Sequence, residues 1–214
     1  MRRELTFIMF TVALALGCFR TRNVPAIEMY RLLPTDSASI DVAAEHLPDG
    51  AVAVARFITP GLYGQRGIVY RVDDAGYGAY PSREWAIPLG EQLGRRTVDL
   101  MQHRALVRGG ALFEPPSRRG FTHAWRGTVR EFEEVDRGDD VFVAVNLEAS
   151  LTRIEDDSIV WSGGKRVERA VPEGTMEGII AGLSAATDEV LVALLDSARV
   201  SIRQKSANGS GSPR

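Results

Sequence analysis

The chain has one cysteine, three histidines and almost no net charge, and each shortage excludes a class of function. Cys18 is the only cysteine among 214 residues, so no intrachain disulfide can form. His46, His103 and His123 are far apart in the sequence, and no second cysteine can complete a zinc site with them, so we expect no metal and no cofactor. The formal net charge of −2 gives no reason to expect nucleic acid as a partner.

The N-terminus lacks an apolar run long enough to cross a bilayer. Arg2 and Arg3 precede an apolar run from Phe7 to Leu16, which is about ten residues, whereas a transmembrane helix needs roughly 20. A short apolar run after positive charges is typical of a cleaved signal peptide. We therefore expect residues 1–17 to be a signal peptide that is removed after export.

The cleavage site explains why a lone cysteine is present. Residues 15–18 (ALGC) resemble the lipobox of bacterial lipoproteins, in which a small residue precedes a cysteine that receives lipid on its sulfur. The alternative is that Cys18 is the last apolar residue of an ordinary signal peptide. That alternative does not explain why an exported protein has a single cysteine, with no second one to form a disulfide in an oxidising compartment. Lipidation at Cys18 with two or three acyl chains would anchor the protein firmly. Phe19 stands where a retention aspartate would hold an enteric lipoprotein at the inner membrane, so we expect the outer membrane, facing the periplasm.

The rest of the chain is long enough for one domain between two short polar segments. We expect residues 18–26 to be a lipidated tether and residues 27–203 to be a single domain. The tail at 204–214 (QKSANGSGSPR) has no large apolar residue that could dock on a core, so we expect it to be disordered.

Alternation of apolar and polar residues predicts most of the strands. Between Val141 and Leu151 every second residue is apolar, which is the period of a strand with one buried face. Turn signals on both sides predict an antiparallel meander, and shorter β-rich runs precede it. The expected strands are 28–33, 51–57, 67–72, 77–80, 123–135, 140–154 and 158–168.

Two segments have helical spacing instead. The first is expected to run from Ser82, a plausible N-cap, to about His103, with Pro88 in its first turn. The second follows Thr175 and carries an apolar stripe from Ile179 to Leu195. The sequence therefore predicts an α+β fold, a single-domain sandwich in which two long helices cover a mostly antiparallel sheet.

A search for catalytic groups finds none, and we predict that the protein is not an enzyme. Residues 182–186 (GLSAA) approach a nucleophile elbow, but the serine lies inside the second expected helix. The glycine pairs at 109–110 and 163–164 lack the pattern of a phosphate loop and are expected to be turns or bulges. Of the acidic pairs, 133–134 should point to opposite faces of a strand and 156–157 should lie in a turn, so we expect solvated charges.

The order of several motifs resembles a known family, the ABC-type transport auxiliary lipoproteins, typified by paraquat-inducible protein C. The likeness covers most of the chain after the lipobox, including a long strand, a hairpin and a terminal amphipathic helix. The chain departs from it in a long loop at 109–120 and in Ile87, where an acidic residue is usual. The motifs are YRLLP at 30–34, LYGQRGIVYR at 62–71, WAIPL at 85–89 after Tyr77 and Tyr80, and VREFE at 129–133.

The resemblance implies an accessory subunit that docks rather than catalyses. Its partners would be an ABC-type permease and a periplasmic protein with a mammalian-cell-entry domain, which together move lipids between membranes, and homo-oligomers fit such systems. The candidate partner surface is Tyr63, Arg66, Tyr70 and Arg71, although tyrosines and arginines in a strand can also simply pack and pair. Two alternatives stay open, a scaffold or cell-wall-binding lipoprotein and a small periplasmic enzyme.

Overall fold

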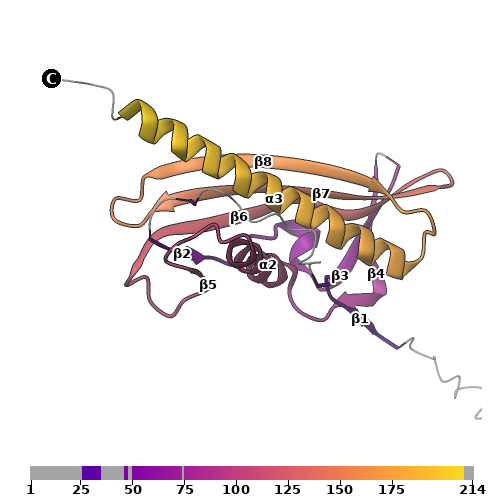
Figure 1. The fold of residues 1–214 in the computed structure, drawn as a ribbon. Helices are drawn as coiled ribbons and strands as arrows, with labels where there is room; N and C mark the ends of the chain where they lie inside the picture. Colours follow the sequence, from indigo (N-terminus) through magenta and orange to yellow (C-terminus); the bar gives the residue numbers. More distant parts are fainter. Residues whose placement is uncertain (1–25, 35–45, 48–49, 74, 210–214) are drawn as a thin grey trace, which may run out of the picture.

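The computed structural model describes residues 26–34, 46–47, 50–73 and 75–209. Within these residues, eight strands form one sheet, and two long helices and a short 3-10 helix complete the fold (Figure 1). The expected signal peptide, Cys18 and the tether up to residue 25 lie outside the described residues. The elements are β1 (Glu28–Tyr30), β2 (Ala51–Val54), η2 (Gly61–Gly64), β3 (Gly67–Val72), β4 (Gly76–Trp85), α2 (Leu89–His103), β5 (Ala111–Phe113), β6 (Phe121–Arg137), β7 (Asp140–Arg153), β8 (Ile159–Ala170) and α3 (Met176–Gly209).

Three long consecutive strands make up most of the sheet. β6, β7 and β8 pair antiparallel in sequence order, as the alternation predicts. The other edge of β6 carries two shorter strands placed end to end, because β2 pairs with its first residues and β3 with its last. β5 extends the sheet beyond β2, and β4 followed by β1 extends it beyond β3.

The expectation of a mostly antiparallel sheet is wrong, because the sheet is mixed. β2 and β3 both run parallel to β6, and β1 with β4 and β2 with β5 are also parallel pairs. Parallel neighbours need a long crossover connection. Here β4, α2 and β5 supply it between β3 and β6.

The first long helix begins later than its expected N-cap. Residues 82–85 complete β4, and α2 starts at Leu89 with Pro88 as its N-cap residue. The carbonyl of Pro88 accepts the backbone N–H groups of Glu91 and Gln92, which closes the first helical turn. Trp85 therefore belongs to the sheet, where it is buried and packs edge-on against Phe132.

The second helix covers the sheet as predicted and is longer than predicted. The hydroxyl of Thr175 accepts the N–H of Gly178, which caps α3. The helix continues to Gly209, so the expected disordered tail at 204–214 is wrong up to that residue, and residues 210–214 lie outside the described residues. The helix outlasts the prediction because backbone bonds extend it past its last apolar contact.

The core lies between the sheet and the two helices, which pack on the same face (Figure 1). Val143, Val145 and Leu147 of β7 share one apolar cluster with Leu183 and other residues of α3, which confirms the predicted inward face. α3 is also long and apolar enough to span a membrane by length and composition, with a mean hydropathy of 1.7. Just over half of its most apolar window, 56%, is buried in the fold, as expected for a core helix.

Candidate docking surface

A buried carboxylate joins three strands and the short helix on the face of the sheet away from α3. Glu133 of β6 is 0% exposed. Its carboxylate accepts the hydroxyl of Tyr63 at 2.5 Å, Nε of Arg71 at 2.7 Å and the hydroxyl of Tyr77 at 3.3 Å. These donors come from η2, β3 and β4, so one side chain ties together segments far apart in the sequence.

Strand register explains why these side chains meet. Arg71 lies opposite Tyr77 of β4 on one side and beside Val135 of β6 on the other. Val135 and Glu133 are two residues apart, so they share a face of the sheet with Arg71. Burial and the bond to Glu133 raise the pKa of Tyr63, so its phenol stays protonated and donates. We call these four residues, Tyr63, Arg71, Tyr77 and Glu133, the Glu133 cluster.

The next glutamate faces the other way and has different partners. Glu134 is 4% exposed and accepts the hydroxyl of Tyr80 at 2.8 Å. Tyr80 packs against Tyr70, with ring centroids 5.0 Å apart, and the Arg83 guanidinium lies 4.8 Å from its ring centroid. Burial raises the pKa of the Glu134 carboxyl. Adjacent strand residues do point to opposite faces, as expected, but the prediction that this acidic pair is solvated is wrong.

The four residues of the predicted partner surface do not form one patch. Tyr63 and Arg71 meet at Glu133, whereas Tyr70 points with Tyr80 to the opposite face. The side chain of Arg66 is exposed, and its carbonyl accepts the N–H of Trp85. Whether a partner contacts Tyr63, Arg66, Tyr70 or Arg71 stays a prediction.

A ladder of ion pairs continues from the Glu133 cluster across the outer face. Arg166 of β8 bonds Glu131 at 2.7 Å and Glu168 at 2.8 Å, and Arg137 bonds the same Glu168 at 2.5 Å. The two arginines lower the pKa of Glu168 to about 2 despite its partial burial, and Arg137 has the larger effect.

A groove of about 530 Å³ lies further along this face, beside Arg126, Glu148 and Ser150. The glycine pair 163–164 lines it from within β8, so the expectation of a turn or bulge there is wrong.

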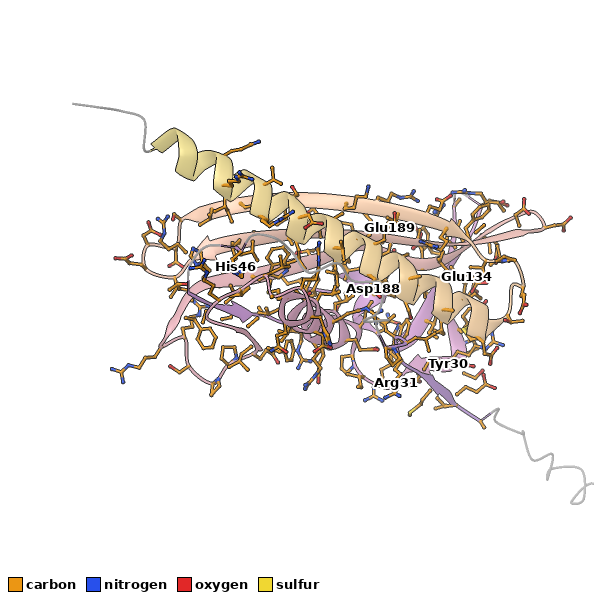
Figure 2. All side chains as sticks on the ribbon, viewed as in Figure 1. Tyr30, Arg31, His46, Glu134, Asp188 and Glu189 are labelled. Carbon is orange, nitrogen blue, oxygen red and sulfur yellow. The ribbon has the colours of Figure 1, made fainter. Side chains whose placement is uncertain are left out.

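The sequence analysis missed a clamp that holds the start of the domain between the two helices. The N–H of Leu32 bonds Oε1 of Gln92 at 2.8 Å, and the N–H of Leu33 bonds the hydroxyl of Ser184 at 2.9 Å. Arg96 donates to the carbonyl of Leu33 and forms an ion pair with Asp188, which Figure 2 labels on α3. Polar residues on the inner sides of two apolar helices were the available signal, because buried polar groups need partners.

The histidines, the helix serine and the exposed acidic pair each have a defined place in the described part of the chain. In that part of the chain no three His, Cys, Asp or Glu side chains gather into a metal site. Nδ1 of His46 and Nδ1 of His103 each lie within hydrogen-bond distance of a backbone carbonyl, and burial lowers the pKa of His123.

The hydroxyl of Ser184 donates to the carbonyl of Ile180 within α3, so this serine is a helix residue, as predicted. The acidic pair 156–157 lies in an exposed turn, also as predicted.

The fold and this surface define a class of protein, a sheet domain whose helices cover one face and whose other face presents polar side chains. A family model described as ABC-type transport auxiliary lipoprotein component matches residues 30–194, and the chain belongs to this family. The family's description makes the chain a lipoprotein associated with ABC-type transport, with a place at a membrane of the cell envelope. No curated protein matches the chain.

Solved structures show the same fold at low sequence identity. A Xanthomonas campestris protein, XCC0632, is 17% identical with a TM-score of 0.72, and the match covers 84% of this chain and 99% of that one. An uncharacterised protein is 16% identical with a TM-score of 0.58 over the same shares. PelC from Paraburkholderia phytofirmans, which was solved as a dodecamer, is 13% identical with a TM-score of 0.50 over 72% of this chain and 92% of that one. None of these proteins is described as an enzyme.

Proposed function

We propose that this protein is the lipid-anchored accessory subunit of a transport system that combines an ABC-type permease with a periplasmic mammalian-cell-entry protein and moves lipids between membranes. The observation that carries the proposal is the family match over residues 30–194. The subunit acts by docking. Its helices cover an apolar face of the sheet, and its other face is rich in hydrogen-bonding side chains, which suits recognition more than chemistry.

The Glu133 cluster supports this role because it fixes the side chains that a partner would meet. Arg71 is held by Glu133, and Tyr77 is 52% exposed above it. Nearby, Arg66 offers an exposed cation at the turn into β3. Tyrosine and arginine are the residues most enriched where protein interfaces gain their binding energy. The dodecamer of PelC, which shares this fold, supports a homo-oligomer as the assembled form.

Lipid at Cys18 is the second part of the proposal. Cys18 follows the expected signal peptide directly, so cleavage would leave it as the first residue of the mature protein. Metabolic labelling with a radioactive fatty acid such as palmitate should tag the wild-type protein, and Cys18→Ser should abolish the label. Equal labelling of both proteins would refute the anchor. Fractionation should place the labelled protein in the outer membrane, and recovery with the inner membrane would refute that destination alone.

Docking is tested by charge reversal at two exposed arginines. Arg66→Glu should reduce co-purification of the mammalian-cell-entry protein and permease with the tagged full-length chain by about tenfold or more, which corresponds to roughly 1.4 kcal/mol. Arg118→Glu is the matched control, because Arg118 is also exposed but lies in the loop before β6. Both variants should melt like the wild type. Equal recovery with both variants would exclude this surface, and the absence of both partners from the wild-type sample would refute the transport role.

A further inference from the structure

The first strand exposes two large apolar side chains that the fold does not use. Ile27 is 54% exposed and Met29 is 59% exposed. Successive residues of an extended chain point to opposite sides, so Ile27 and Met29, which are two positions apart, share one side. Tyr30 on the other side packs against the core, and its hydroxyl bonds the Glu28 carboxylate at 2.7 Å. The outer side of this segment is therefore apolar, whereas Glu28 shares the inner side with Tyr30.

This strand is held firmly in place, so its outer side has a fixed direction relative to the domain. β1 pairs parallel with residues 83–85 of β4, and the carbonyl of Tyr30 accepts the N–H of Ala86. The next residues enter the clamp, where Gln92, Ser184 and Arg96 hold the backbone of Leu32 and Leu33. A segment with this many bonds does more than connect a domain to its anchor.

The distance along the chain to the lipid attachment site limits what can cover the exposed side. Ile27 lies nine positions after Cys18. Nine residues span at most about 30 Å when fully extended. A lipid at Cys18 thus keeps Ile27 within about 30 Å of the bilayer surface, and Met29, eleven positions after Cys18, within about 40 Å. Arg31, which is exposed and follows Met29 closely, adds a cation on the same strand side (Figure 2 labels it beside Tyr30).

We infer that β1 is a membrane-contact edge, on which Ile27 and Met29 enter the interface of a phospholipid bilayer and Arg31 lies among the lipid phosphates. The inference rests on the lipid anchor of the proposed function. Apolar side chains gain free energy on leaving water for this interface, and a basic residue is attracted to anionic lipid. Two carboxylates oppose this attraction: Glu84, which lies opposite Met29 in the register of β1 and β4, and Glu28, whose carboxylate lies 3.7 Å from Arg83.

Contact between β1 and the bilayer would determine the orientation of the whole domain relative to the membrane. β1 lies at one end of the elongated molecule, and the C-terminal end of α3 lies at the other (Figure 1). The β7–β8 turn and β5 are also at the far end, because β2 and β5 pair beside the first residues of β6. With β1 on the bilayer, that far end points away from the membrane and toward soluble partners.

The solitary native cysteine makes a direct test possible. The variant Met29→Cys is labelled at residue 29 with the fluorophore NBD, since a lipidated Cys18 does not react. The lipidated full-length protein is placed in vesicles of phosphatidylethanolamine and phosphatidylglycerol, with or without lipids that carry a nitroxide near the headgroup. The matched control is Ile159→Cys, because Ile159 is 64% exposed and lies at the far end of the domain.

The label at residue 29 should shift its emission to the blue and lose about half of its intensity to the nitroxide lipids, because interfacial segments lie roughly 5–10 Å into the headgroup region. The label at residue 159 should show neither change. No quenching at residue 29 would overturn the inference, and so would a blue shift without quenching, which would place a second copy of the chain over β1. Failure of fatty-acid labelling at Cys18 is a separate result that removes the anchor itself.

Discussion

The two faces of the sheet use the same long strands and differ in chemistry. On the inner face, Phe132, Val145 and Val167 form one row across β6, β7 and β8, and all three are buried. One residue further along, the outer row begins with Glu133 and ends with Glu168. The inner row is held by packing against helices, whereas the outer row is held by hydrogen bonds and ion pairs.

This difference separates what makes the fold from what is available for recognition. Apolar burial is non-directional and tolerates changes of side chain that keep volume and pattern. The outer face depends on particular donors and acceptors, such as the three bonds to Glu133, that place side chains in fixed positions. Family relatives at low identity can share the apolar packing of the inner face without sharing the particular donors and acceptors of the outer face.

The largest expected effect comes from uncovering the inner face. A truncation after Gly174 removes α3, which buries more than six large apolar side chains in the core. At about 1.5–3 kcal/mol for each buried side chain, this loss exceeds the roughly 5–15 kcal/mol that stabilises a typical domain. The truncated protein should be insoluble or degraded when its yield is measured after expression. Removing residues 210–214 alone should leave yield and melting temperature unchanged. A soluble, cooperatively melting truncation would show that the core is elsewhere.

The second effect tests whether the outer face also stabilises the protein. Glu133→Ala leaves the Arg71 guanidinium, whose side chain is 12% exposed, without its partner and frees two phenols. Removing one partner of a buried ion pair typically costs about 3–5 kcal/mol. Urea unfolding should show a loss of this size. Glu148→Ala is the control, because the Arg130–Glu148 pair is half exposed and its loss should cost much less stability. Equal losses would mean that the Glu133 cluster contributes no more than a surface pair.

Periodicity predicted the parts of the fold that are governed by burial. The alternation at 140–154 and the stripe after Thr175 place β7 and α3 correctly, because core-facing residues must repeat with the period of the element. The prediction that residues 82–85 are helical was wrong, because apolar residues near helical spacing continue from β4 into α2. The boundary between the two elements is set by Pro88. Parallel pairing of β2 and β3 with β6 depends on the crossover connection, which local pattern does not encode.

The candidate site was harder to predict because its contacts join distant residues. Tyr63 and Arg71 were singled out, but their acceptor Glu133 was placed in solvent, since a charged residue in a strand usually faces water. The available signal is weak: Tyr63, Arg71 and Tyr77 lie near one another in the sequence and supply donors. β6, however, carries Glu131, Glu133 and Glu134, and local pattern does not indicate which of them is the acceptor. For the clamp on Leu33, polar residues on two apolar helices indicated that partners were needed, but local pattern did not identify those partners, because Arg96 and Ser184 are 88 residues apart.

A smaller effect concerns the ion-pair ladder. The pKa of Glu168 is lowered to about 2, so its ionised form stabilises the fold above the ordinary pKa of 4.5, and this stabilisation is lost as the pH falls from 4.5 through about 2. Glu168→Gln should therefore lose about 1–2 kcal/mol at pH 7, after allowance for solvent screening of a partly exposed pair. The deficit relative to wild type, measured by urea unfolding, should shrink below pH 4. A deficit that does not change with pH would assign the loss to packing.

The smallest effect has the opposite sign and comes from the buried carboxyl on the inner face. Burial raises the pKa of Glu134, so its protonated form favours the fold. That contribution is complete below pH 4.5 and is lost as the pH rises through the raised pKa, so the ionised group opposes folding at pH 7. Glu134→Gln keeps an acceptor for the hydroxyl of Tyr80 and removes the charge, so it should be more stable than wild type at pH 7 by about 1 kcal/mol or less. The gain should vanish below pH 4.5 in the same urea series. A loss of stability at pH 7 would mean that the bond to Tyr80 needs the ionised carboxylate. Glutamates on both faces of the sheet would then stabilise the fold in their ionised form.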